Sequence, residues 1–319
     1  MIRRGTLASL VVWTALVSPA SAEVISTTPG VAYLDAFHGT VAWSSLDQST
    51  GGYSLKALVG GRVQTLPVAT RPVPFDVDLG PAGDGGIVAA YSRCERDFEL
   101  GFGVYSRPII GVGCRVFLYS FATGRERALP RAAGVRNEFS PAVWKDRLVV
   151  FSQRGDLRSP VMLRTRSLDA RTAGHRLPAG SRGPSAGPVD VDVRDRRIVF
   201  IWQGVEGEPA AEDGRSLDMR TEVWTVTVGG KRTRLARSPA DGDAPVIVSA
   251  MVLPDAVGYL RRSGGPYFVR VMSDGRRLAT EVEETAIDVA FSLGRTFTFR
   301  RVANGPYEIA ASEQAPPGP

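Results

Sequence analysis

The chain has 319 residues, of which 43% are hydrophobic, and a formal net charge of +6. Its 39 Lys and Arg residues are scattered singly or in pairs among 33 Asp and Glu residues. This pattern lacks the focused positive field of a nucleic-acid site and argues against that class of function. Only two histidines are present, His38 and His175, and neither has a metal-ligand spacing around it.

Residues 1–22 have the three parts of a secretory signal peptide. Two arginines give a cationic start, an apolar stretch runs from Leu7 to Val17, and small residues precede Glu23. The apolar stretch is roughly half of the ~20 residues that a membrane-spanning helix needs. We therefore expect cleavage after residue 22, no transmembrane segment in the mature chain, and a secreted, periplasmic or cell-envelope location.

The mature chain repeats a unit of four short strands in roughly 40 residues plus insertions, the length of a propeller blade. The clearest similarity between units is a glycine-led turn before an outer strand. Glycine supplies the positive φ that tight hairpins need. This shape recurs at 60–67, 123–130, 174–178, 229–235 and 273–278. The units span about 32–68, 74–130, 138–178, 188–236, 246–280 and 285–312.

The two ends of the chain complement each other. The last unit is one strand short, whereas residues 23–29 have no unit of their own and are similar to the outer strand at 62–67. We predict that residues 23–29 supply the missing strand and close the ring, which also removes a free strand edge. A two-sheet sandwich is the competing fold, because strand alternation by itself does not separate the two.

Cys94 and Cys114 are the only cysteines, and in an exported chain they predict a disulfide. They flank a long loop between the second and third strands of unit two. The loop interior carries Phe98, Phe102 and Tyr105, which are candidates for contact with a partner or ligand. The alternative is that these aromatic side chains pack onto the blade as local core.

Three aspartates recur at one position in units two, four and six: Asp76, Asp190 and Asp288, each preceded by an apolar residue and followed by valine. Propeller geometry places them near one end of the central channel. There they either hold a calcium ion or cationic group or accept hydrogen bonds from amides of adjacent blades. Because their recurrence follows the repeat, the structural role is favoured. Asp78 and Asp192 lie two residues further along the chain, on the same side of the strand, and the same two roles are open for them.

The units resemble those of TolB-type propellers and related six-bladed exported proteins. The resemblance is carried by Phe139-Ser140-Pro141, which opens one unit, and by residues 273–278, which close another. It implies an all-β, six-bladed propeller in one domain over 23–312, followed by a disordered tail at 313–319. The usual Ser-Pro-Asp-Gly turn is intact in no unit, and the separate N-terminal domain of TolB is missing, so the resemblance supports the fold more than any partner.

The sequence contains no Gly-x-Ser-x-Gly elbow and no phosphate-binding glycine loop. We therefore expect a binding or scaffolding module for an unknown protein or small ligand, with no cofactor and no catalytic site. The alternative is a divalent-metal-dependent hydrolase or lyase with a metal, calcium for example, held at the channel by the three recurring aspartates. The counterpart positions in units one, three and five are Ala32, Phe139 and Val248. These side chains are not metal ligands, which argues against such a site.

Overall fold

The structure is a computed structural model. It describes residues 22–30, 32–99, 109–155, 159–172, 174–177, 187–206, 218–228, 230, 232–238, 246–262, 266–282, 285–303 and 305–313. The expected signal peptide up to residue 21 and the expected tail from residue 314 lie outside the described residues.

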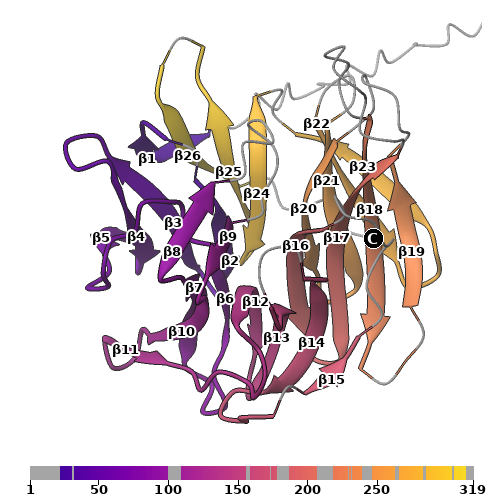
Figure 1. Ribbon diagram of the computed structural model, residues 1–319. Coiled ribbons are helices and arrows are strands. Elements are labelled where there is room, and N and C mark those ends of the chain that lie inside the picture. Colours follow the sequence, from indigo (N-terminus) through magenta and orange to yellow (C-terminus); the bar gives the residue numbers. More distant parts are fainter. Residues whose placement is uncertain are drawn as a thin grey trace, which may run out of the picture.

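Six antiparallel sheets of four strands form a ring, with the inner strand of each sheet at the centre (Figure 1). Blade 1 contains β2 (Leu34–Phe37), β3 (Thr40–Asp47), β4 (Gly52–Val59) and β5 (Arg62–Thr65). Blade 2 contains β6 (Asp78–Pro81), β7 (Ile87–Arg93), β10 (Arg115–Ser120) and β11 (Arg125–Ala128). Blade 3 contains β12 (Asn137–Trp144), β13 (Arg147–Gln153), β14 (Met162–Ser167) and β15 (His175–Arg176).

The second half of the ring follows the same plan. Blade 4 contains β16 (Gly187–Arg194), β17 (Arg197–Glu206), β18 (Asp218–Thr227) and β19 (Arg232–Arg237). Blade 5 contains β20 (Val246–Val252), β21 (Ala256–Arg262), β22 (Pro266–Met272) and β23 (Arg277–Glu281). Blade 6 contains β24 (Ala286–Ser292), β25 (Arg295–Arg301) and β26 (Tyr307–Ser312). The predicted six-bladed β-propeller is confirmed, and the sandwich is wrong.

The first strand of the chain closes the ring. Strand β1 (Glu23–Thr28) lies antiparallel beside β26 and completes blade 6, with Glu23 opposite Ala311 and Thr28 opposite Tyr307 (Figure 1). The Thr28 hydroxyl also accepts a hydrogen bond from the amide of Leu46 in blade 1, at 3.1 Å. The predicted closure is therefore confirmed, and it satisfies the edge of β26 that would otherwise stay unpaired.

The hydrophobic core lies between the blades, so both faces of a blade are buried. In β13, Val149 and Phe151 pack towards blade 4, whereas Leu148 and Val150 pack towards blade 2. All four side chains are fully buried. Because successive strand residues point to opposite faces, this strand has a continuous apolar run rather than an alternating one.

The glycine-led turns occur where the sequence predicts them. The turns between third and fourth strands have glycine at positive φ in blades 1, 2, 3 and 5: Gly61, Gly124, Gly174 and Gly275, with φ of 77°, 66°, 67° and 85°. A side chain with a Cβ is disfavoured in this region of φ. The repeat seen in the sequence is therefore a repeated need for glycine at positive φ, in turns of different length.

Blade 2 departs from the prediction at its inner strand, because β6 begins at Asp78 rather than at Phe75. The shortened strand β6 lies very close to blade 3. A Cβ on Gly80 would lie 2.0 Å from the carbonyl oxygen of Val143, so only glycine fits here. The amide of Lys145 donates to the carbonyl oxygen of Pro81 at 2.6 Å beside this contact.

The described residues contain no helix, and therefore none that is long and apolar enough to span a membrane.

Candidate functional site

A one-residue bulge sets the position of the channel side chains in three inner strands. In β16, β20 and β24 the first paired residue after the bulge is Asp190, Ser249 and Asp288, respectively. Asp190 and Asp288 are therefore equivalent, as the sequence predicts. The blade 5 counterpart is Ser249 rather than Val248, because the bulge adds one unpaired residue ahead of it.

Asp76 is held in place by four donors although it lies just before β6. Its carboxylate accepts hydrogen bonds from the Ser92 amide (2.7 Å), the Ser92 hydroxyl (2.6 Å) and the Ser140 amide (2.7 Å). The guanidinium of Arg71 lies 3.5 Å away in a buried ion pair. Since Ser140 belongs to β12, Asp76 joins blade 2 to blade 3.

Asp190 and Asp288 make the same kind of contact at other junctions. Asp190 Oδ2 accepts the amide of Ala250 in blade 5 at 2.9 Å. Asp288 Oδ2 accepts the amide of Leu34 in blade 1 at 3.2 Å, so it lies across the junction where the ring closes. We call Asp76, Asp190 and Asp288 the upper layer of the channel. Each of them accepts an amide hydrogen bond from the following blade.

A second set of carboxylates lies one step deeper. Asp78 Oδ2 accepts the amide of Val143 at 2.7 Å, and Asp192 Oδ2 accepts the amide of Val252 at 2.5 Å. In blade 1, Asp35 Oδ2 accepts the amide of Leu79 at 2.5 Å. We call Asp35, Asp78 and Asp192 the lower layer. It joins blade 1 to blade 2, blade 2 to blade 3 and blade 4 to blade 5.

Asp35 was not expected from the sequence, because it lacks the apolar-Asp-Val pattern. Asp35 can be identified in the sequence by its distance from the hairpin turn that follows it. Asp35 pairs with Ala42 and Asp192 with Val199, and each pair is the third one back from a tight turn between the first and second strands. Counting from the turn relates Asp35 to Asp192 because the β16 bulge lies on the other side of this position, whereas Asp78 is in the fourth pair back from its own turn.

Asp76 and Asp190 of the upper layer and all three aspartates of the lower layer line one cavity of about 50 Å³ at the channel. Asp78 is buried, and Asp35 and Asp192 are partly buried. Burial raises the pKa of Asp35 well above its usual value, and the nearby charge of Asp192 raises it further. Burial likewise raises the pKa of Asp78, with further effects from Asp35 and Asp192.

The pKa of Asp192 is raised as well. Burial raises its pKa to about 6, although the amides of Val252 and Val193 and the charge of Arg194 act in the opposite direction. The lower layer is therefore a group of carboxyl groups that bind protons more tightly than an ordinary aspartate does.

The described carboxylates do not fit a calcium ion. Calcium takes six to eight oxygen ligands at 2.3–2.6 Å. Asp76 already accepts hydrogen bonds from both groups of Ser92 and from Ser140. Among the described residues, no three His, Cys, Asp or Glu side chains are placed to share one ion. A channel calcium stays a prediction with no support from this donor set.

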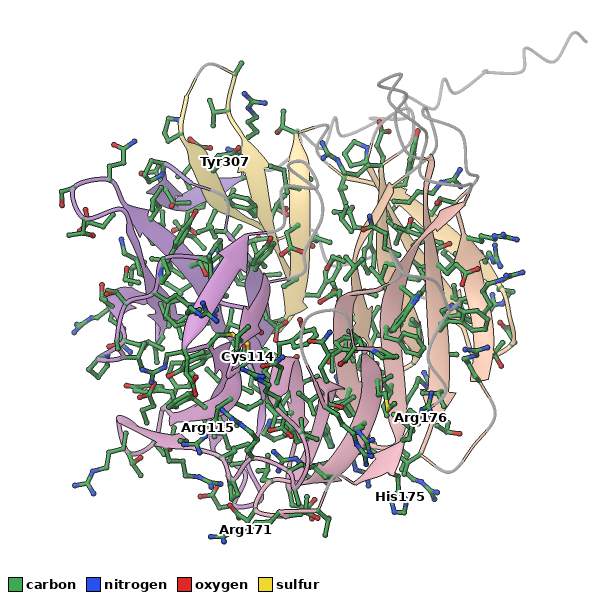
Figure 2. The ribbon with its side chains drawn as sticks, viewed as in Figure 1. Cys114, Arg115, Arg171, His175, Arg176 and Tyr307 are labelled. Atoms are coloured by element: carbon green, nitrogen blue, oxygen red, sulfur yellow. A yellow bond between two sulfur atoms is a disulfide. The ribbon has the colours of Figure 1, made fainter. Side chains whose placement is uncertain are left out.

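The blade 2 loop contains an additional hairpin, β8 (Arg96–Glu99) and β9 (Ile109–Val112), that the sequence did not predict. The predicted disulfide between Cys94 and Cys114 is confirmed and closes the base of this loop, where Cys114 is completely buried (Figure 2). The backbone of Phe98 is paired with Ile110, but its side chain, Phe102 and Tyr105 lie outside the described residues.

The base of this loop is also anchored to blade 3. The buried Asn137 side chain accepts hydrogen bonds from the amides of Gly113 (2.8 Å) and Cys114 (3.3 Å), and it donates to Gln153 at 3.2 Å. The guanidinium of Arg131 donates to the carbonyl oxygen of Gly113 at 2.8 Å. The disulfide and these hydrogen bonds together fix where the hairpin leaves the propeller.

The two histidines are not brought together. His38 is in the turn between β2 and β3 of blade 1, with φ of 47°. His175 is in β15, the outer strand of blade 3, and lies at the edge of the molecule (Figure 2). They belong to different blades, so they do not form a shared acid-base or metal site.

Comparisons with known proteins show the fold. No protein-family model matches the chain, and no curated protein has a matching sequence. A protein of unknown function from Dyadobacter fermentans DSM 18053 is similar with a TM-score of 0.51, at 12% identity over 92% of this chain and 96% of that one. An ulvan lyase of family PL25 gives a TM-score of 0.48 at 9% identity, covering 88% of this chain and 82% of the lyase.

An acylaminoacyl peptidase complexed with a chloromethyl ketone gives a TM-score of 0.48 at 9% identity, covering 89% of this chain. This chain spans about half of that peptidase and of a second one from Pyrococcus horikoshii, 51% and 53% of their lengths. At these identities the likeness extends to the propeller fold alone, and a TolB-type family is not established.

Proposed function

We propose that this protein is a binding or scaffolding propeller of the cell envelope or extracellular space, without a catalytic site, and that it holds a protein partner on the face that carries the β8–β9 hairpin. The observation that carries the proposal is the double attachment of this hairpin, by the Cys94–Cys114 disulfide and by the hydrogen bonds of Asn137 and Arg131. No other blade has such an addition within the described residues.

An ordered insertion has a cost in conformational entropy of about 1–2 kcal/mol per residue. A disulfide that closes a loop with a sequence separation of 20 offsets part of this cost, by roughly 3 kcal/mol in the chain-entropy description. A hairpin whose base is already fixed loses less entropy when a partner binds to it. The attachment of the hairpin is therefore what a preorganised binding surface requires.

The contacts of the channel aspartates are a second argument for the same proposal. The metal-dependent alternative needs carboxylates with oxygen atoms available to an ion or substrate. The six channel aspartates instead accept amide hydrogen bonds from the following blade. This use of the carboxylates supports a structural role for the channel and therefore supports the proposal that recognition occurs at the loops.

The test uses the mature chain, tagged at its C-terminus, to capture proteins from the exported fraction of the producing organism. The wild type is compared with a Phe98→Ala/Phe102→Ala/Tyr105→Ala variant, and the captured proteins are measured by quantitative mass spectrometry. A specific partner is then purified, and its Kd is measured by titration calorimetry. We expect the triple variant to weaken binding at least tenfold, because buried aromatic anchors dominate protein interfaces.

Two further variants make the result specific. Leu293→Ala removes an exposed apolar side chain from the turn between β24 and β25, in another blade, and should leave the Kd unchanged. Cys94→Ser/Cys114→Ser keeps the aromatic residues but releases the base of the hairpin and should weaken binding. If the triple variant binds every partner as the wild type does, the hairpin face is not the binding surface.

A further inference from the structure

The lower layer of the channel concentrates acidic groups from three blades around a small cavity. Asp35, Asp78 and Asp192 come from β2, β6 and β16, and all three line the cavity of about 50 Å³. Each of them also accepts an amide hydrogen bond of 2.5–2.7 Å from the next blade. The same three side chains therefore link blades in pairs and face one another across the channel.

The surroundings of this layer contain little positive charge. Asp190 acts on Asp35 and Asp78 with the same sign, and Asp76 and Asp288 lie one step above in the upper layer. Arg194 is the cation that acts on Asp192. The cavity-lining residues of β12 and β20 are Ser140, Pro141, Ser249, Ala250 and Met251, which do not titrate. Arg71, the other nearby cation, is paired with Asp76 of the upper layer, so proton binding is the means of neutralising Asp35 and Asp78 that the cavity lining offers.

We propose that the lower layer is a proton-dependent lock between blades: with protons bound it links blade 1 to blade 2, blade 2 to blade 3 and blade 4 to blade 5, and without them its three carboxylates repel one another. A protonated carboxyl keeps one oxygen as acceptor for the amide of the next blade and gains an O–H donor towards the cavity. Proton binding therefore removes the repulsion and leaves the interblade hydrogen bonds in place. This inference is independent of the binding function proposed above.

The sign of the pH dependence follows from proton binding. The pKa of each lower-layer aspartate is raised in the folded state, so the folded protein binds more protons than the unfolded chain between the two pKa values. The stabilisation is complete below the unfolded pKa and is lost as the pH rises through the folded pKa. For Asp192, with a pKa of about 6 against an ordinary aspartate value of 3.8, the unfolding constant rises about 60-fold from pH 4 to pH 7.

The experiment measures urea unfolding of the mature protein from pH 4.5 to pH 8. The wild type is compared with Asp35→Asn, Asp78→Asn and Asp192→Asn, because asparagine keeps the acceptor oxygen and removes the titration. We expect the wild-type unfolding constant to rise with pH and each variant to show a rise that is at least tenfold smaller over the range. Asp274→Asn, at an exposed aspartate whose pKa is lowered by the Arg276 amide, serves as the control and keeps the wild-type slope.

A second measurement needs no variant and remains decisive if a variant fails to fold. Carbon-13 NMR of the aspartate carboxyl groups in the wild type follows each titration directly. We expect the three lower-layer carboxyl groups to titrate above the ordinary aspartate range, with Asp192 near pH 6. The proposal is overturned if all three titrate below pH 4.5, or if the asparagine variants keep the full wild-type slope.

Discussion

The junction between blades 4 and 5 and the junction between blades 3 and 4 hold neighbouring sheets together in different ways. At the first, Asp190 and Asp192 accept the amides of Ala250 and Val252, and the Thr221 hydroxyl accepts the amide of Ile247 at 3.2 Å. At the second, the inner strand β12 contains no aspartate. Both junctions bury an apolar cluster from the two blades, so junction 4–5 has the aspartate hydrogen bonds in addition to its packing.

The aromatic cluster of junction 3–4 is built around Phe151. Its ring centroid lies 6.3 Å from that of Phe139 in the same blade and 6.2 Å from that of Trp202 in blade 4. Polar contacts lie at the rim, where the Trp144 indole donates to Asp195 at 3.0 Å. The comparison teaches that packed area is common to both junctions, that aspartate hydrogen bonds are added at junction 4–5, and that only the added contacts contain groups that bind protons.

The largest effect is expected from Phe151→Ala. The side chain is completely buried, and its removal leaves a cavity at the centre of the cluster, so the free energy of unfolding should fall by about 3–5 kcal/mol. Because no titrating group is involved, the loss should be equal at pH 5 and pH 7.5. Urea unfolding at both pH values measures it, with Val63→Ala at a 44% exposed side chain as the control. A loss that differs between the two pH values would show that junction 3–4 is electrostatic as well.

A smaller effect is expected at the polar junction from a pair of substitutions at Asp190. Asp190→Ala removes the acceptor of the Ala250 amide, and an unsatisfied buried amide costs about 1–3 kcal/mol. Asp190→Asn keeps an acceptor oxygen and should be less destabilising than the alanine variant. Thermal unfolding at pH 7 compares them directly. Equal losses for the two variants would mean that charge, rather than the interblade hydrogen bond, is the important property of Asp190.

The smallest effect is expected from calcium. Since the upper-layer carboxylates are engaged with amides, 1 mM calcium should leave the Tm of the wild type unchanged. The Asp76→Ala/Asp190→Ala/Asp288→Ala variant should have a lower Tm with and without the ion. A calcium-dependent increase in the Tm of the wild type that the variant loses would instead support a metal site at the channel and the enzyme alternative.

The junctions also show which features could be predicted from the sequence. The recurrence of an aspartate in units two, four and six is a local pattern, and Asp190 and Asp288 occupy equivalent places in the structure. Asp76 carries the same pattern but precedes the strand. Ahead of Asp76, Arg71 pairs through its backbone with Tyr53 of blade 1, a contact that no local sequence pattern predicts.

Taken alone, the sequence determined the all-β class, the six blades, the closing strand and the disulfide, because each depends on periodicity, turn residues or a residue count. The tertiary structure decided the rest. Asp35, Asp78 and Asp192 meet only because the ring brings three blades to one channel. The counterpart in blade 5 is Ser249 because of a bulge, and a bulge shifts the register by one residue without leaving a mark in composition or hydrophobic pattern.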